Sequence, residues 1–493
     1  MMYKFTAIAA ALFVITTAQA QNETDAYRYS NIQFNGTARY NGMGGAFGAL
    51  GGDISCMSVN PAGIARYTKS DFNFSLLYED INSNTGFLGN TTLGGKGNLN
   101  FGSIGFVGAK KLDDYDWRYM HFGIAYNRTN FFHNDFTLTG DNPSSSMADV
   151  FRGTANGYTT SELADYFPNS AELAYQAYLI DPTDTNSNTT TYTDRVPEGI
   201  TVNQSRNVYQ TGYMSEFAFN FAGNYMDKLY IGGSFGIPGA RFHEEFLHTE
   251  ILSDPDTLTS LEQFTYSQSL TSRGVGFNMK FGVIYLPVDN VRLGASFHSP
   301  NYLSFNETWN NNMTSQFDDG DNYDVDGPLN TYVWRMRTPA RLMGSVAVVV
   351  AKMAAIDVDV EYVDYGSMRM KRDWSDQSGY DFSQENKVIS QNYKSVVNVR
   401  AGAEVRIKPF YLRAGFGLSP SPYTSGITVS DASIRTISSG LGIRHKTFSC
   451  DLGLNFIKYG QDYYPYDPVL FNRNPGVITT NIVRTTMTFG WKF

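Results

Sequence analysis

Segments in which apolar and polar residues alternate one by one recur from Phe72 to the end of this 493-residue chain. Alternation with a period of two is typical of β-strands, because successive side chains point to opposite faces of a sheet. The contrast is sharpest where Ile356, Val358 and Val360 alternate with three carboxylates. Similar segments follow one another without a linker, so we expect one large β-structure rather than several domains.

The lengths of the connections indicate which face of these strands meets water, since alternation alone fits a soluble sandwich as well as a membrane barrel. Long connections are predicted at Glu79 to Gly97, Phe131 to Arg206 and Pro238 to Gln268, and short ones at Met226 to Lys228 and Lys408-Pro409. Regular alternation of long and short connections is typical of outer-membrane barrels. The sequence therefore predicts an all-β fold, an antiparallel transmembrane β-barrel of about 14 strands over residues 71–493, with a polar lumen.

A glycine-rich stretch precedes the first alternating segment. It runs from Gly36 to Gly63 and carries no charged residue between Arg39 and Asp53. Such a segment has neither helical nor strand periodicity, so we expect a compact, irregular plug, or hatch, formed by residues 21–70 inside the barrel. A nucleotide site is excluded because the glycine spacing breaks at Phe47 and no Lys-Ser or Lys-Thr follows.

The first residues resemble a secretory signal. A lone Lys4, an apolar run from Ala7 to Ile15 and the sequence Ala18-Gln19-Ala20 predict a signal peptide at residues 1–20, cleaved after Ala20. No other stretch approaches the roughly 18 apolar residues of a membrane helix. We therefore expect an exported protein that has no helix to anchor it.

Composition agrees with a membrane barrel and excludes other classes. The chain has 33 Tyr and 35 Phe with only 17% charged residues, which suits aromatic belts at two membrane surfaces. The net charge of -9 excludes a basic nucleic-acid footprint, so no nucleic-acid partner is expected. Cys56 and Cys450 lie too far apart in the chain to indicate a disulfide framework.

The end of the chain also alternates. Met487, Phe489, Trp491 and Phe493 share one face of the final segment. A terminal Phe on an aromatic strand resembles the assembly signal of bacterial outer-membrane barrels. We expect this strand to engage the outer-membrane assembly machinery, and the mature protein to lie in the bacterial outer membrane in contact with its lipid.

Two features stand out in the long connections. Apolar residues at partly helical spacings between Ser161 and Leu179 predict short helices, with Ser161 and Ser170 as caps. The basic run Met368 to Asp373 (MRMKRD) predicts a solvated patch or one facing lipid head groups.

The plug segment contains Arg39, Gly42, Gly45, Ala46, Asp53, Ser55 and the closing Asn60-Pro61-Ala62. In these residues it resembles the FadL/TodX family of outer-membrane transporters for long-chain fatty acids and other hydrophobic compounds. In the barrel, Thr338 to Leu342 with Gly344, and Val399 to Glu404 followed by Leu412 to Gly415, are similar to further family motifs. The insert from Leu138 to Asn207 has no counterpart in this resemblance.

The resemblance implies a route for the ligand. A hydrophobic molecule would bind among the outer loops and then in the lumen, and leave sideways through an opening in the wall at a kinked third strand. In that strand Tyr126 and Arg128 share the lipid-facing phase with Asn130, and Arg128 and Asn130 are expensive in contact with hydrocarbon. A register change would relieve this cost, so we place the lateral opening at Tyr126, Asn127, Arg128 and Asn130. The alternative is that Arg128 and Asn130 lie above the membrane.

The strands also predict charges in the lumen. The inward-facing charged residues are Asp357, Asp359, Glu361, Arg400, Glu404, Arg406, Arg413, Arg444 and Asp451. Unpaired buried charge is costly, so the acids and arginines are expected to meet across strands or on the plug. The alternative is a hydrated wall without functional weight.

The sequence thus predicts transport of hydrophobic small molecules, most simply long-chain fatty acids or else aromatic compounds. A passive porin-like channel and haem uptake are the alternatives; haem could take His243 and His248 as ligands, although no paired motif surrounds them. The six histidines are scattered and no G-x-S-x-G elbow occurs, so we expect no enzyme. No cofactor and no metal site are predicted.

Overall fold

The computed structural model describes residues 23–113, 116–253, 260–351, 353–376, 379–466 and 475–493. The predicted signal peptide, residues 1–20 with cleavage after Ala20, lies outside these ranges. Among the residues that the structure describes, no helix has both the length and the hydropathy needed to cross a membrane.

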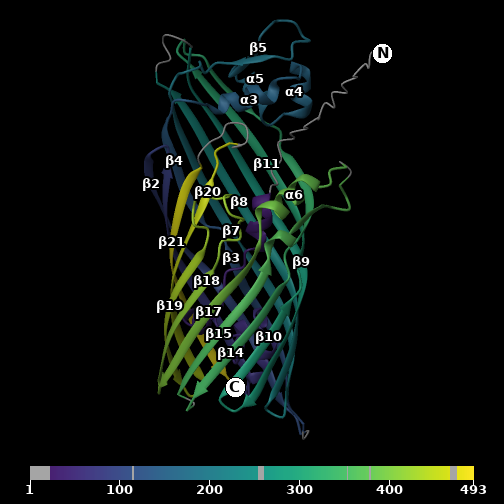
Figure 1. Ribbon diagram of the computed structural model, residues 1–493, viewed down its shortest axis with the longest axis vertical. Coiled ribbons are helices and arrows are strands. Elements are labelled where there is room, and N and C mark those ends of the chain that lie inside the picture. The colour runs from purple at the N-terminus through teal and green to yellow at the C-terminus, as the bar shows by residue number, and fades with distance from the viewer. Residues whose placement is uncertain (1–22, 114–115, 254–259, 352, 377–378, 467–474) are drawn as a thin grey trace, which may run out of the picture.

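The strands form a closed antiparallel barrel of 14 strands, as predicted (Figure 1). The wall contains β1 (Asp71–Phe87), β2 (Asn90–Lys111), β3 (Trp117–Phe131), β4 (Asn134–Asn142), β7 (Val202–Tyr225), β8 (Leu229–Leu252), β9 (Leu261–Val288), β10 (Val291–His298), β11 (Tyr302–Phe317), β12 (Asn322–Asp326), β13 (Asn330–Arg337), β14 (Arg341–Val350), β15 (Ala354–Asp364), β16 (Arg369–Arg372), β17 (Ser395–Ile407), β18 (Phe410–Ser419), β19 (Ile434–His445), β20 (Phe448–Tyr463) and β21 (Gly476–Lys492). Across short breaks, β3 and β4 form one wall strand, as do β10 and β11, β12 to β14, and β15 and β16, which brings the number of wall strands to 14. Pairing of β1 with both β2 and β21 closes the barrel.

The barrel is inverted with respect to a soluble protein. Outward-facing apolar side chains remain exposed, for example Phe221 at 64% and Val275 at 60%, while Asp357 and Arg484 are buried inside at 0% and 1%. This arrangement places apolar residues toward lipid and charged residues toward the lumen, as in a transmembrane barrel.

Several strands are longer than predicted. The expected long connection from Glu79 to Gly97 is in fact strand, and only Leu88 and Gly89 join β1 to β2. Most of the expected connection from Pro238 to Gln268 also continues β8 and β9. Beyond the apolar belt both faces of these strands are polar, as in 82–85, so the sequence loses the alternation that identifies a strand.

A small cap covers the outer end of the barrel, seen at the top of Figure 1. It contains α3 (Met147–Ala155), α4 (Thr160–Tyr166), α5 (Ala171–Gln176), β5 (Ile180–Pro182) and β6 (Tyr192–Asp194). Its apolar side chains pack on the outer ends of the wall strands, including Phe151 against Tyr266. The predicted helices are present, but α4 begins after Thr159 rather than at Ser161, because Glu162 and Thr159 form a capping box.

The remaining helices lie at the N-terminus and in one outer connection. The N-terminal ones are α1 (Glu23–Ser30), α2 (Ala38–Gly42), η1 (Ile54–Ser58) and η2 (Pro61–Arg66), and the outer ones are η4 (Tyr365–Ser367) and α6 (Ser383–Asn392). Figure 1 shows the N-terminal elements, in purple, enclosed by the strands. The chain leaves η2 at Arg66 and enters the wall at Asp71.

Candidate functional site

The plug is more regular than its glycine content suggested. Each of its three short helices begins at a side chain that accepts a backbone N–H: Thr37 from Tyr40, Asp53 from Ser55, and Asn60 from Ala62. Asp53 also accepts a 2.9 Å hydrogen bond from the Thr37 hydroxyl, which joins the first two caps. The expected irregular segment is thus a set of capped single turns, a form that sequence periodicity cannot detect because each turn is too short.

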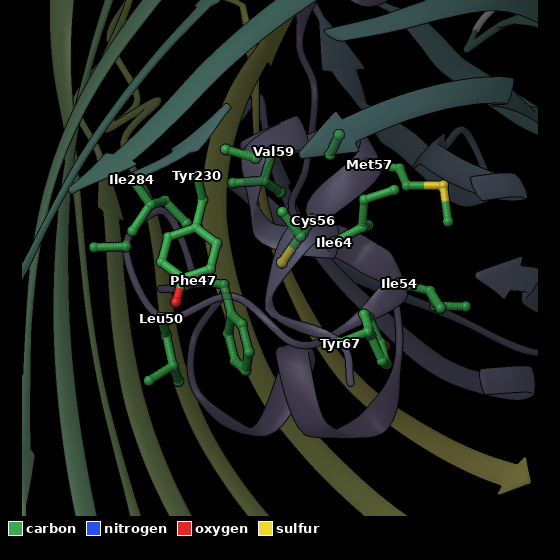
Figure 2. Close-up of a cluster of buried hydrophobic side chains, with 14 of the residues drawn as sticks. Phe47, Leu50, Ile54, Cys56, Met57, Val59, Ile64, Tyr67, Tyr230 and Ile284 are labelled. Carbon is green, nitrogen blue, oxygen red and sulfur yellow. The ribbon is translucent and has the colours of Figure 1, made fainter. Parts of the chain in front are cut away.

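Apolar side chains fill the space between the plug and the wall. Figure 2 shows Phe47, Leu50 and Cys56 of the plug in the cluster that also contains Tyr230 of β8 and Ile284 of β9. Cys56 and Cys450 are both free thiols. The plug therefore packs on the wall as a hydrophobic core does.

Glycines of the plug allow this close packing. A Cβ added to Gly42 would lie 3.1 Å from the Gly440 Cα of β19, and one added to Gly48 would lie 1.9 Å from the Ser345 hydroxyl. Gly45 has a φ of +75°, which favours glycine, and a Cβ added to it would lie 2.6 Å from Phe34 of the N-terminal segment itself. Backbone approach to the wall at Gly42 and Gly48 requires the absence of a side chain.

Two wall carboxylates bind the backbone of the plug. Asp359 accepts hydrogen bonds from the N–H groups of Phe47 (3.0 Å) and Gly48 (3.1 Å). Asp357 accepts from Ala49 (3.3 Å) and Leu50 (3.0 Å). Asp359 was predicted as a lumen charge, and its partner is backbone rather than an arginine. Buried carboxylates can be held in this way because several N–H dipoles point at the charge.

A chain of ion pairs joins the plug to β17, β18 and β20. Arg39 donates to both oxygens of Glu404, at 2.8 and 2.9 Å, and to the Gly52 carbonyl at 3.0 Å. Arg413 binds the same Glu404 at 2.7 Å and Asp451 at 2.7 Å. One arginine of the plug is thus held in a network of wall charges.

A second group of charges forms ion pairs between wall strands, and its Arg341 also donates to the Ser30 carbonyl of α1 at 2.6 Å. Glu361 binds Arg341 at 2.8 Å and Arg400 at 2.9 Å. Arg406 and Arg444 behave differently: both lie over the ring of Tyr411, and neither has an acidic partner within the described ranges.

Two buried ion pairs were not predicted from the sequence. Arg484 of β21 binds Glu79 of β1 at 2.8 Å, and Lys280 of β9 binds Glu216 of β7. Glu79 was predicted to begin a loop, so its orientation toward the lumen was not considered. Lys280 alternates with lipid-facing residues of β9, so its inward position could have been predicted.

The third strand is irregular where the lateral opening was placed. Its ladder with β2 ends at the pair Ser103 and Asn127. Its register with β7 shifts between Arg128 and Asn130. As a result Asn127 and Asn130 are both buried, and Tyr126 remains in the outward phase, partly exposed. Arg128 stacks on Tyr213, 3.9 Å from the ring centroid.

The N-terminal segment, residues 31–35, covers this irregularity from inside. The Gln33 N–H donates to the Thr129 carbonyl at 3.0 Å, and the Asn35 amide donates to the Arg128 carbonyl at 3.0 Å. Asn130 donates to the Asn31 carbonyl at 2.8 Å. Wall carbonyls at the register shift are thus satisfied by the N-terminal segment.

Helix α1, directly before this segment, fills an aromatic region of the lumen. The ring of Tyr29 lies 4.4 Å from Phe305 and 5.9 Å from Phe132, measured between centroids. Phe305 in turn stacks on Trp334 at 4.6 Å. The N-terminal segment also borders a cavity, which is lined by Ile32, Phe34, Leu418, Ile457, Arg400 and Arg484.

Comparison with solved structures finds several barrels of the same fold. A FadL homologue of Pseudomonas aeruginosa superposes with a TM-score of 0.59 at 11% identity, covering 94% of this chain and 99% of that chain. The Pseudomonas putida toluene transporter TodX gives 0.53 at 12% identity, covering 93% and 98%. The Ralstonia pickettii toluene transporter TbuX gives 0.51 at 13%, covering 93% and 98%. The predicted resemblance is thereby confirmed for the fold, that of an outer-membrane barrel with an internal plug.

Sequence comparison adds nothing further. No protein-family profile matches this chain, and no curated protein matches it.

Proposed function

We propose that this protein takes up hydrophobic small molecules through the outer membrane and releases them sideways into the membrane between β2 and β3. The observation that carries the proposal is the register shift at Arg128 and Asn130, which residues 31–35 close from the lumen side. Solved barrels of the same fold are described as toluene transporters and as a FadL homologue, which supports an apolar ligand.

Binding and opening are coupled in this proposal through one continuous stretch of chain. An apolar ligand that enters the aromatic region competes with Tyr29 for Phe305 and Trp334, and so displaces α1. Burial of the ligand contributes roughly 0.8 kcal/mol per CH2 group toward that displacement. Withdrawal of α1 pulls residues 31–35 away from the Thr129 carbonyl and uncovers the gap in the wall.

Long-chain fatty acids are the ligands we favour. The Arg484 side chain donates to the Phe34 carbonyl at 3.4 Å and to Gln33 at 2.7 Å, in addition to binding Glu79. When residues 33 and 34 withdraw, these donors become available to a carboxylate at a cavity that also has apolar walls. An aromatic hydrocarbon would use the apolar walls alone.

The structure favours transport over the two alternatives. A passive porin needs an open lumen, whereas the plug here is packed on the wall and tied to it through Arg39, Asp357 and Asp359. For haem, His243 faces outward and bonds Thr271 and Glu245, while His248 faces inward and bonds Glu250. Histidines on opposite faces of β8 cannot ligate one haem.

Mass spectrometry of molecules that copurify with the barrel, followed by binding of radiolabelled palmitate and of toluene, tests this proposal. We expect bound fatty acid, and weaker palmitate binding in the double variant Glu79→Gln/Arg484→Gln with unchanged toluene binding. The double variant avoids leaving Glu79 buried without its partner. Absence of binding by both probes to a folded barrel would contradict the proposal.

A further inference from the structure

Three pairs of like charges face each other across neighbouring strands on the outside of the barrel. Arg241 of β8 is opposite Arg273 of β9. Arg335 and Arg337 of β13 are opposite Lys371 and Arg369 of β16. The side chains at 240, 242, 272, 334, 336 and 370 point inward and are buried, so these six cations occupy the outward phase. Like charges directly opposite on a sheet destabilise it, so three such pairs need an explanation.

These six residues form what we call the basic arc. Strand β11 lies between its two halves, with Asn306 opposite Arg273 and Ser304 opposite Arg335. The arc is therefore continuous across β8, β9, β11, β13 and β16. The protein as a whole carries a net charge of -9, so such a cluster does not follow from composition.

Contacts within the protein neutralise little of this charge. Among the residues that the structure describes, the arc has one acidic ion-pair partner, Asp373, which lies 3.7 Å from Arg335. Arg335 also donates to the Arg372 carbonyl at 3.0 and 2.7 Å. Arg337 and Arg369 donate to backbone carbonyls at the break between β15 and β16. Arg241, Arg273 and Lys371 have no hydrogen bond or ion pair recorded in the described part of the chain, and all three are exposed.

The height of the arc places it at the membrane surface. In the register of β9 and β11, Phe277 is opposite Tyr302, Val275 opposite Ser304, and Arg273 opposite Asn306. On β9 the exposed apolar side chains of the belt thus end at Val275, two residues from Arg273, and on β8 the exposed Ile237 lies four residues from Arg241. Trp374, 87% exposed, lies beside Arg335, whose guanidinium is 3.9 Å from the indole centroid. Tryptophan and arginine are enriched where a protein meets lipid head groups.

We propose that the basic arc binds a lipid of the outer leaflet whose head group carries phosphomonoesters. Phosphates between the opposed cations replace their repulsion by charge-assisted hydrogen bonds, and arginine forks match phosphate oxygens in pairs. The acyl chains of the same lipid lie along the belt below, over Phe277 and Tyr302. The proposal rests on the membrane placement of the barrel and not on the transported ligand.

Titration with lipid followed by native mass spectrometry tests the site directly. The probes are bisphosphorylated lipid A, the same lipid after removal of both phosphates, and inorganic phosphate, each added to the detergent-purified full barrel. The variant combines Arg241→Gln, Arg273→Gln, Arg335→Gln and Lys371→Gln, and leaves Arg337 and Arg369, which bind backbone carbonyls at the break between β15 and β16. The matched control is Arg435→Gln/Lys458→Gln, an outward pair that also faces across strands but has Asp431 as an acidic partner.

We expect the wild type and the control to bind the phosphorylated lipid with affinities within about twofold of each other, and the quadruple variant to bind it at least about tenfold more weakly. Folding is checked by heat-modifiable mobility on gels. Equal binding by the folded quadruple variant, equal binding of the dephosphorylated lipid, or full competition by inorganic phosphate at the lipid's concentration would each overturn the proposal. Because lipid binding is measured directly, failure of the transport proposal would leave this result unaffected.

Discussion

Arg39 of the plug binds Glu404 of the barrel wall through two hydrogen bonds of 2.8 and 2.9 Å. Glu404 also holds Arg413, so the carboxylate would keep one cation if the plug moved. A buried carboxylate that keeps one cation when it loses the other suits a plug that is held in place and can still move.

Replacing Arg39 by alanine is expected to loosen the plug without unfolding the barrel. The loss is about 1–3 kcal/mol of plug attachment, because charge-assisted hydrogen bonds are removed while Glu404 keeps Arg413. Single-channel recordings of Arg39→Ala should show higher conductance than the wild type. The exposed control Arg435→Ala should have the conductance of the wild type. Wild-type conductance of Arg39→Ala would contradict the role of the Arg39–Glu404 pair in holding the plug.

Gly48→Ala tests the close approach of the plug to β14. The added Cβ would lie 1.9 Å from the Ser345 hydroxyl and 2.7 Å from an Asp359 oxygen, so one of them must shift, at a cost of about 1–3 kcal/mol. We expect faster proteolysis within residues 36–63 of the folded barrel. Gly344→Ala, next in sequence to Ser345 with nothing within 4 Å of its added Cβ, is the control. Equal proteolysis of the two variants would show that the contact is not restrictive.

Asp359→Asn should weaken the plug locally. The amide keeps one acceptor oxygen but loses the charge that the N–H groups of Phe47 and Gly48 stabilise. Hydrogen exchange at those two amides should accelerate about tenfold or more, as expected for a loss near 1.5–3 kcal/mol. Asp80→Asn, on the exposed face of β1, should leave their exchange unchanged, and protection retained in Asp359→Asn would contradict the role of this carboxylate.

The sequence predicted the barrel because a period of two persists wherever one face meets lipid and the other the lumen. It failed above the membrane, where residues such as Asn82 and Ser83 are polar on both faces and strand became indistinguishable from loop. That error removed Glu79 from the predicted lumen charges.

Which charged side chains pair was harder to predict than which of them face the lumen. The inward phase of Glu361 and Arg400 follows from alternation, but which cation meets which acid depends on register between strands. The role of Asp359 was missed for a different reason. Its partners are backbone N–H groups of the plug, and backbone groups leave no sequence signal.

Tyr29→Ala tests whether α1 competes with the ligand. Removing the ring leaves an apolar space beside Phe305 and Trp334, and it weakens the docking of α1 that a ligand must displace. We expect palmitate to bind the detergent-purified variant about tenfold more tightly. Tyr78→Ala, on the lipid-facing side of β1, should not change the affinity. Weaker binding by Tyr29→Ala would mean that Tyr29 contacts the ligand rather than competing with it.

Uptake through a barrel that is locked between β2 and β3 tests the lateral exit most directly. Ser103 and Asn127 are the last register partners of that ladder, so Ser103→Cys/Asn127→Cys can form a disulfide that prevents the strands from separating. The matched control is Ser438→Cys/Asn455→Cys, an inward Ser and Asn pair between β19 and β20. Both pairs are placed in a Cys56→Ala/Cys450→Ser background. We predict that oxidation abolishes uptake of labelled fatty acid only in the β2–β3 pair, that binding to the purified barrel persists, and that reductant restores uptake. Unchanged uptake in cells whose β2–β3 cross-link is complete would contradict an exit at this position.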